Sequence, residues 1–332
     1  MLYFGDVAFT KSLLPRIDGV LEFFDRHVDE LGLISGLPSE IWQYCDWVEG
    51  WHATHQHPDK GVPTAGRLSN RHTYFSMLYA YVLKQAAVLV RRAGRPQYAE
   101  EYETRAEKMI QAIRKHCFDE KLGIFTDSTS DVPPDTPTPY SQHAQVFAVL
   151  SGACPPCEAP SLLLKSFDPS SNLHLGKCSY VMMFYAFRAF ATVEGVYEKL
   201  LETAMKPWYR MIRQNMTTWE EDDVRQRSDC HAWGSVPVYE YLCEIAGVHP
   251  TSKGCGDILF RPRVSMRDEY RATVALGRNR AEVSWKREGD VIKVLLELDE
   301  EVGVASQLPN GKKTEHGCVR HIDLEYQYDS KS

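Results

Sequence analysis

The sequence lacks an uncharged apolar run of the roughly 18 residues that a membrane-spanning helix needs, so we expect no membrane span. It also lacks a basic start followed by an apolar stretch and a small-residue cleavage site, so no signal peptide is expected and a cytoplasmic location is predicted. Basic residues are scattered and not in excess, with a formal net charge of -7. This charge distribution argues against a site for nucleic acid or anionic lipid.

The cysteines show no framework spacing, and their number, nine, is odd, so reduced thiols are expected. Cys154 and Cys157 have the spacing of a redox or metal pair, but they lie in a proline-rich turn without a second ligand pair. Zinc is the alternative interpretation of a loop that contains His52, His55, His57 and Asp59. Because this spacing matches no zinc site that we recognise, we expect a solvated loop, no metal and no cofactor.

The first three quarters of the sequence show helical periodicity. Apolar residues recur at helical spacing over residues 9–28, 73–92, 98–117, 141–150, 179–192, 196–211 and 237–246. Long loops separate these segments at residues 30–72, 118–140 and 214–235. In an all-α chain, loops of this length often carry function.

The pattern changes after Pro250, where ATVALG, AEVSWKREG, VIKVLLEL and HIDLEYQY alternate or run apolar between turn residues. We therefore predict two domains, a helical domain over 1–250 and a small antiparallel β-sandwich over 251–332. Antiparallel helix pairs with long loops at one end predict an α/α toroid. The segments are too few for six hairpins, so the toroid is expected to be incomplete.

One segment, TTWEEDDVRQRSDCHAWGS at residues 217–235, interleaves carboxylates with Trp219, His231 and Trp233. Solubility explains the charges but gives no reason to mix them with aromatic rings. A flat, partly polar ligand such as a sugar suits such a mixture, because it presents an apolar face and a ring of hydroxyl groups. Glu220 is either a catalytic base or the first-turn acid of a short helix. Its neighbours Glu221, Asp222 and Asp223 are expected on a solvated loop.

The order of several motifs resembles that of the bacterial α-L-rhamnosidases, which are six-hairpin glycosidases. The motifs are YFGDVAFTKSLLPRIDGVLEFF, CDWVEG, YSQHAQVFAVLSG, TTWEEDD and SDCHAWGSVPVYEYLCEIAGV. The resemblance covers nearly all of this sequence and corresponds to the C-terminal two-thirds of the family's pattern. It implies an α/α six-barrel, a C-terminal β-sandwich and metal-free, inverting hydrolysis of terminal α-L-rhamnosides.

The same resemblance implies roles for individual residues. Glu220, which directly follows Trp219, corresponds to the general base that activates water. His231 corresponds to a histidine that contacts the sugar, with Trp233 in the same segment. The remaining substrate-binding candidates are Asp46 and Trp47 on the pocket wall and His143, which either lines the pocket or caps a helix.

The family's general acid lies in an upstream segment, and nothing like that segment occurs in this sequence. Loss of proton delivery commonly costs about 10²- to 10⁴-fold in rate. The hypotheses left open are an impaired rhamnosidase, a non-catalytic carbohydrate-binding remnant, a fragment of a longer gene product, and a related six-hairpin glycosidase for another sugar. The partner in each case is a small saccharide or glycoside, and an incomplete barrel also has a reason to form a homo-oligomer.

Overall fold

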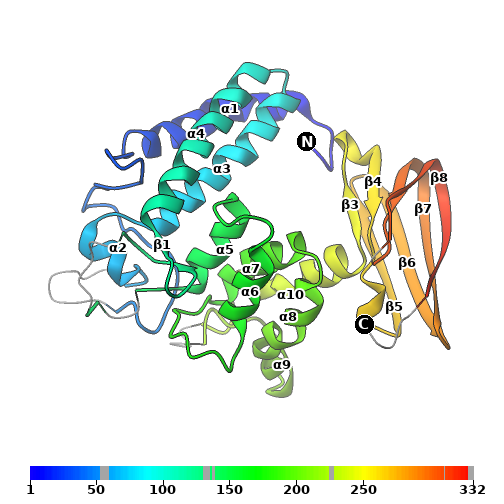
Figure 1. The fold of residues 1–332 in the computed structure, drawn as a ribbon. Helices are drawn as coiled ribbons and strands as arrows, with labels where there is room; N and C mark the ends of the chain where they lie inside the picture. Colours follow the sequence, from blue (N-terminus) through cyan, green and yellow to red (C-terminus); the bar gives the residue numbers. More distant parts are fainter. Residues whose placement is uncertain (53–59, 130–134, 137–138, 224–227, 310, 328–332) are drawn as a thin grey trace. The chain divides into compact units, whose positions relative to one another are not determined.

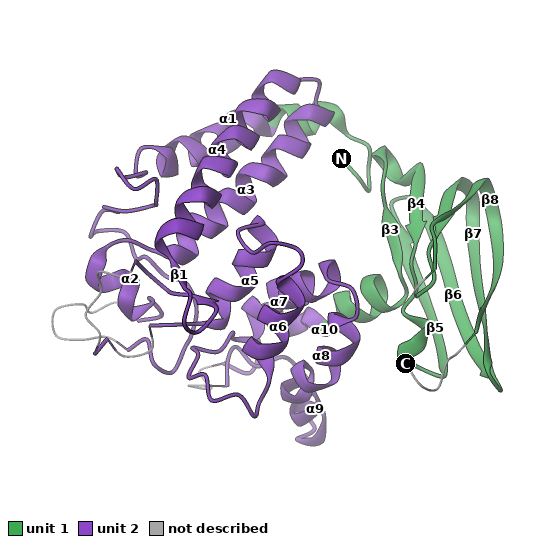
Figure 2. Cartoon of the chain, viewed as in Figure 1, with its two compact units in different colours: residues 1–12, 237–332 green, residues 13–236 purple. Residues whose placement is uncertain are grey.

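The structure, a computed structural model, describes residues 1–52, 60–129, 135–136, 139–223, 228–309 and 311–327. The chain divides into two compact units, which Figure 2 shows in different colours. Unit 2 comprises residues 13–236, and unit 1 comprises residues 1–12 together with 237–332. No helix among the described residues is long and apolar enough to cross a membrane.

Unit 2 is built from helices that pack in chain order. Helices α3 and α4 form a hairpin, α5 packs on α3, α7 on α5, and α8 on α7 (Figure 1). A short hairpin of β1 (Phe118–Asp119) and β2 (Ile124–Phe125) follows α4. The helix bounds are α1 Val7–Asp25, α2 Thr64–Ser69, α3 Thr73–Arg92, α4 Pro96–His116, α5 Gln142–Ser151, α6 Ala159–Phe167, α7 Tyr180–Thr192, α8 Val196–Ala204 and α9 Lys206–Arg213.

Periodicity predicts the long helices well, and the differences have local causes. Helix α3 has the predicted bounds, whereas the predicted helix 196–211 is divided at Met205 into α8 and α9. Pro207 explains the division, because proline has no backbone N–H to donate to the preceding turn. Helices α2 and α6 were not predicted. Both are short, and the prolines at their starts resemble turn residues in the sequence.

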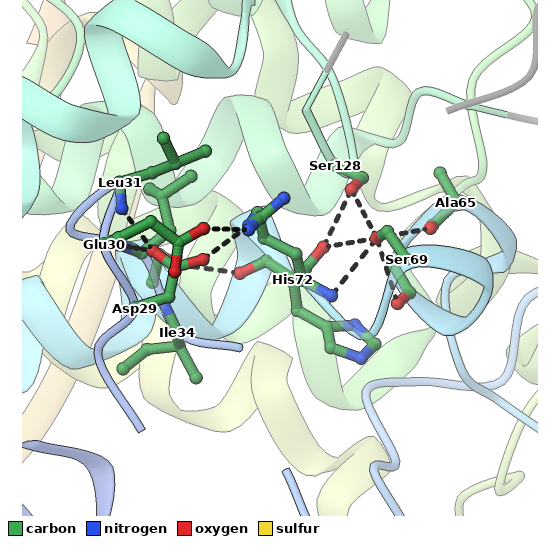
Figure 3. A network of polar contacts seen from close by, with 12 residues as sticks. Asp29, Glu30, Leu31, Ile34, Ala65, Ser69, His72 and Ser128 are labelled. Atoms are coloured by element: carbon green, nitrogen blue, oxygen red, sulfur yellow. Dashed lines mark hydrogen bonds and ion pairs between the residues drawn. The ribbon is translucent and has the colours of Figure 1, made fainter. Parts of the chain in front are cut away.

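A polar network connects the loop after α1 to the segment between α2 and α3 (Figure 3). The Arg71 guanidinium lies 2.6 Å from the Asp29 carboxylate. The Ser69 hydroxyl lies 2.7 Å from that of Ser128, and the Ile34 N–H donates to a side chain of α3 at 2.9 Å. These bonds satisfy loop polar groups that would otherwise be buried without partners. The loops that precede the site are therefore fixed to the helical core.

Unit 1 contains one six-stranded mixed sheet with the order β3-β4-β7-β6-β5, in which β8 also pairs with β7. Strands β4 and β7 are parallel, and the other pairs are antiparallel. The predicted antiparallel sandwich therefore differs from this single mixed sheet, because alternation along a strand does not specify which distant strand it pairs with. The strands are β3 Val248–Pro250, β4 Asp257–Phe260, β5 Glu269–Leu276, β6 Asn279–Glu288, β7 Val291–Ser306 and β8 Thr314–Gln327.

Candidate functional site

Glu220 is fully buried in the segment that follows α9. Its Oε2 accepts a 2.9 Å hydrogen bond from the Tyr180 hydroxyl and forms an ion pair with Arg210. The same Arg210 nitrogen donates to the Tyr180 hydroxyl at 2.8 Å. The other carboxylate oxygen, Oε1, has no hydrogen-bond partner among the described residues. One oxygen of this carboxylate is thus fixed by protein donors, and the other is buried without a hydrogen-bond partner among the described residues.

Three local features bring this group together. Tyr180 is the first residue of α7, and Arg210 lies in α9. Asn215 adopts a left-handed conformation with φ of 54°, which non-glycine residues other than Asn and Asp rarely adopt. It turns the chain after α9, so that Glu220 returns to Arg210. Burial, followed by the charge of Asp223, raises the pKa of Tyr180, so the hydroxyl stays protonated and can donate.

Glu221 and Asp222 are also buried, with exposed fractions of 0% and 1%. The expectation of a solvated loop was therefore wrong for these two carboxylates. Glu221 Oε1 accepts a 3.2 Å hydrogen bond from the Trp47 indole and lies 3.9 Å from the His231 imidazole. A buried carboxylate is stable only when it is paired or hydrogen-bonded. Trp47, which is remote in sequence, consequently supplies one of the partners that the buried Glu221 needs.

Backbone contacts join the two halves of the segment that the sequence singled out. The His231 N–H donates to the Trp219 carbonyl at 2.8 Å, and the Trp233 indole donates to the Glu221 carbonyl at 2.8 Å. The rings of His231 and Trp233 lie 4.6 Å apart and are partly exposed. The structure thus places Trp219, Glu220, His231 and Trp233 in one cluster.

Asp46 and His143 form a separate, fully buried group behind Trp47. Asp46 accepts hydrogen bonds from the backbone N–H groups of Trp47 and Ser179, both at 2.8 Å, and from the Ser179 hydroxyl. His143 Nε2 donates to Asp46 Oδ2 at 2.7 Å, and its ring lies 5.0 Å from that of Trp51. These bonds join the N-terminal ends of α5 and α7 to the loop that carries Trp47.

His143 does not cap α5, because the Ser141 hydroxyl accepts the hydrogen bond from the Ala144 N–H at 3.3 Å. Sequence reasoning also missed Tyr180 and Arg210. Tyr180 is the first residue of the aromatic-rich helix α7, and Arg210 occurs on a charged face of α9. Nothing in their local sequence distinguishes either residue from a structural one.

The alternative metal interpretation concerns a loop in which His52 is the one candidate ligand that the structure describes. Within the described part of the chain, no group of three or more His, Cys, Asp or Glu side chains is arranged to hold a metal ion. His55, His57 and Asp59 lie outside the described residues. Cys154 is buried and Cys157 is exposed, and both thiols are free.

The fold of this chain is similar to that of solved rhamnosidases. A GH78 family rhamnosidase of Bacillus sp. GL1 is 22% identical with a TM-score of 0.77, and the match covers 93% of this chain and 32% of that protein. The α-L-rhamnosidase from Dictyoglumus thermophilum is 17% identical with a TM-score of 0.65, covering 91% of this chain and 33% of its own. The Streptomyces avermitilis α-L-rhamnosidase complexed with L-rhamnose is 17% identical with a TM-score of 0.63, and the match covers 98% of this chain and 31% of that protein.

The chain therefore spans about a third of the length of each of these proteins. A comparison with curated protein sequences finds no match. The sequence model of the bacterial alpha-L-rhamnosidase six-hairpin glycosidase domain matches residues 1–245, which is well over half of the chain. The chain belongs to the family of bacterial alpha-L-rhamnosidase six-hairpin glycosidase domains.

Proposed function

We propose that this protein binds a terminal α-L-rhamnoside and hydrolyses it with inversion, with Glu220 as the general base. The observation that carries the proposal is the asymmetry of the Glu220 carboxylate. Tyr180 and Arg210 occupy Oε2, whereas Oε1 has no hydrogen-bond partner among the described residues. A carboxylate that activates water needs a fixed orientation and one oxygen that no protein donor occupies, within hydrogen-bond reach of that water.

In this proposal the aromatic residues around Glu220 bind the sugar. Trp47, His231 and Trp233 supply flat faces and polar ring edges near the paired carboxylates. Sugar pockets use this combination because C–H faces pack on aromatic rings while hydroxyl groups bond to charged acceptors. In this proposal Asp46 and His143 do not contact the sugar. They hold the loop of Trp47 in position, because their polar groups already bond to Trp47, Ser179 and each other.

Inverting hydrolysis also needs a general acid about 6.5 to 9.5 Å from the base. No segment of the printed sequence matches the family's general-acid segment, so we propose that this chain acts slowly on substrates with poor leaving groups. Aryl rhamnosides with an acidic phenol, such as 2,4-dinitrophenyl α-L-rhamnoside, need no proton at the leaving oxygen. They are the substrates on which Glu220 can be tested in isolation.

The test compares the wild type with Glu220→Gln and, as a matched control, with the exposed neighbouring acid in Glu49→Gln. Glu220→Gln should lower kcat on the dinitrophenyl substrate by about 10²-fold or more, and Glu49→Gln should not. Proton NMR should show β-L-rhamnose as the first product, as inversion requires. Wild-type activity in Glu220→Gln, or α-L-rhamnose as the first product, would refute the assignment.

A non-catalytic carbohydrate-binding protein is the second candidate, and the Arg210–Glu220 ion pair favours it. A buried carboxylate that is paired with arginine and bonded to tyrosine is also what a purely structural or binding role requires. In that case L-rhamnose should bind to the wild type in isothermal titration calorimetry while the dinitrophenyl substrate remains intact. Titration with other hexoses and uronides under the same conditions tests whether rhamnose is the sugar that this site prefers.

A further inference from the structure

Three aromatic side chains, Trp42, Tyr44 and Trp47, lie in mutual contact beside the proposed site, and we call them the aromatic cluster. The ring centroids are 5.0 Å apart for Trp42 and Tyr44, 4.8 Å for Tyr44 and Trp47, and 5.9 Å for Trp42 and Trp47. Trp47 is buried with 7% of its surface exposed, whereas 50% of Trp42 is exposed. The cluster therefore extends from the buried side of the site to the protein surface.

The exposed indole of Trp42 is fixed in position. Its Nε1 donates to the Lys60 carbonyl at 2.9 Å, and the following residue, Gln43, accepts a 2.6 Å hydrogen bond from His72 Nε2. Burial lowers the pKa of His72 to about 3, so this imidazole stays neutral and its bond to Gln43 persists at ordinary pH. A single exposed aromatic residue needs no explanation. An exposed indole whose Nε1 is hydrogen-bonded, and whose neighbour Gln43 is also held in place, is instead a preorganised surface.

Gly61 fixes the other side of the same segment. Its carbonyl accepts hydrogen bonds from the Cys45 and Asp46 N–H groups at 2.8 and 3.2 Å. Gly61 has a φ of 71°, and a Cβ at this position would come within 2.8 Å of the Tyr44 ring. Only glycine allows this close approach. The Tyr44 ring consequently lies close to the Gly61 backbone and in contact with the indoles of Trp42 and Trp47.

The aromatic cluster is continuous with the acidic part of the site. The Trp47 indole donates to Glu221 Oε1 at 3.2 Å. The Tyr44 hydroxyl is buried and has no hydrogen-bond partner among the described residues. Burial raises the pKa of Tyr44, and the nearby charges, which include Asp46 and Glu221, raise it further. The hydroxyl thus lies near carboxylates as a protonated donor.

We propose that Trp42, supported by Tyr44, binds the ring of the substrate that adjoins the terminal sugar. This inference rests on the proposed function. The Trp47 indole contacts the Glu221 carboxylate on one hand and the Trp42 ring on the other. Trp42 is therefore one ring further from Glu221 than Trp47, which we propose to bind the terminal sugar. A face-on indole is selective for flat groups, so the ligand class is an aryl glycoside or a disaccharide whose second ring presents an apolar face.

The test measures binding of L-rhamnose and of 4-nitrophenyl α-L-rhamnoside to the full chain by isothermal titration calorimetry at low temperature. The variants are Trp42→Ala and Trp42→Phe, with Tyr98→Ala as the control because Tyr98 is equally exposed on α4. Trp42→Ala should weaken binding of the aryl rhamnoside about 3- to 10-fold, and Trp42→Phe less. Binding of L-rhamnose should change less than about 2-fold, because the free sugar has no second ring. Thermal unfolding of each variant verifies that it is folded.

Each outcome decides the inference. Unchanged affinity of Trp42→Ala for the aryl rhamnoside, or an equal loss for both ligands, would show that Trp42 does not bind the second ring. In either case binding of L-rhamnose to the wild type leaves the proposed function intact. A wild type that binds neither ligand removes the proposed function, and the role of Trp42 with it.

Discussion

Arg210 and Glu220 form an ion pair in which the carboxylate is fully buried while 37% of the arginine side chain is exposed. The Tyr180 hydroxyl lies between them as a shared partner, accepting from Arg210 and donating to Glu220. Removing one member of such a pair leaves a buried charge uncompensated, which costs more than the pair itself contributes. Arg210 and Tyr180 are therefore positioning residues for Glu220, and their loss should affect activity in a recognisable way.

Replacing Arg210 with Met should lower stability by about 1 to 3 kcal/mol and lower kcat with little change in KM. The physical reason is that the buried carboxylate has lost its cation and one of the groups that orient it. Urea unfolding and steady-state kinetics on 2,4-dinitrophenyl α-L-rhamnoside measure the two effects. Arg210→Lys should restore part of both because it keeps the charge but not the guanidinium geometry. An unchanged kcat in Arg210→Met would exclude this role.

Replacing Tyr180 with Phe removes one hydrogen bond to Glu220 and leaves the ring in place. We expect a loss of about 10-fold in kcat with little change in KM, because the bond orients the base and does not touch the sugar. The cost in stability should be about 1 kcal/mol. Steady-state kinetics and thermal unfolding of the same preparation provide the comparison. A rise in KM alone would instead place the hydroxyl in direct contact with the sugar.

Replacing Asp46 with Asn should destabilise the protein by about 2 to 4 kcal/mol, because the amide cannot accept all the hydrogen bonds that the carboxylate accepts. The donors left without a partner lie at the N-terminal ends of α5 and α7. Urea unfolding measures the loss, with Glu49→Gln as the exposed control. Normal stability combined with weakened L-rhamnose binding would mean that Asp46 contacts the sugar, as the family resemblance implies.

The stability of the protein is expected to depend on pH through the buried carboxyl group of Asp127. Burial raises its pKa to about 8, although the Ser141 hydroxyl donates a 2.6 Å hydrogen bond that lowers it in part. The folded protein therefore retains a proton that the unfolded chain releases near pH 4, and the stability that this proton confers is lost as pH rises from about 4 to about 8. Each pKa unit of the difference corresponds to about 1.4 kcal/mol.

Asp127→Asn keeps an oxygen that accepts from Ser141 but removes the titration. The variant and the wild type should have similar stability at pH 4, and the variant should be more stable by more than about 1 kcal/mol at pH 9. Other titrating groups contribute equally to both proteins, so the difference between their urea unfolding curves isolates this group. Curves that stay parallel from pH 4 to 9 would mean that Asp127 ionises normally in the folded protein.

The sequence predicts the long helices and the family, but it cannot predict which side chains become buried together. Periodicity gives α3 because one face of that helix is apolar over its whole length. Glu221 is bonded to Trp47, and Glu220 to Tyr180, and no local pattern records such remote partners. The parallel pairing of β4 with β7 has the same origin, since the two strands are separated by a hairpin.

Gly234 packs closely against the backbone that carries Trp219 and Glu220. A Cβ there would lie 2.8 Å from both the Glu220 carbonyl oxygen and the Trp219 Cβ, closer than real Cβ atoms approach. Gly234→Ala should therefore displace the backbone that carries Glu220, costing about 1 to 3 kcal/mol and most of the activity. Gly19→Ala is the matched control, because a Cβ at this exposed helical position meets no atom within 4 Å and should stabilise by about 0.5 to 1 kcal/mol. Thermal unfolding and dinitrophenyl rhamnoside hydrolysis measure both, and a fully active Gly234→Ala would show that the base tolerates displacement.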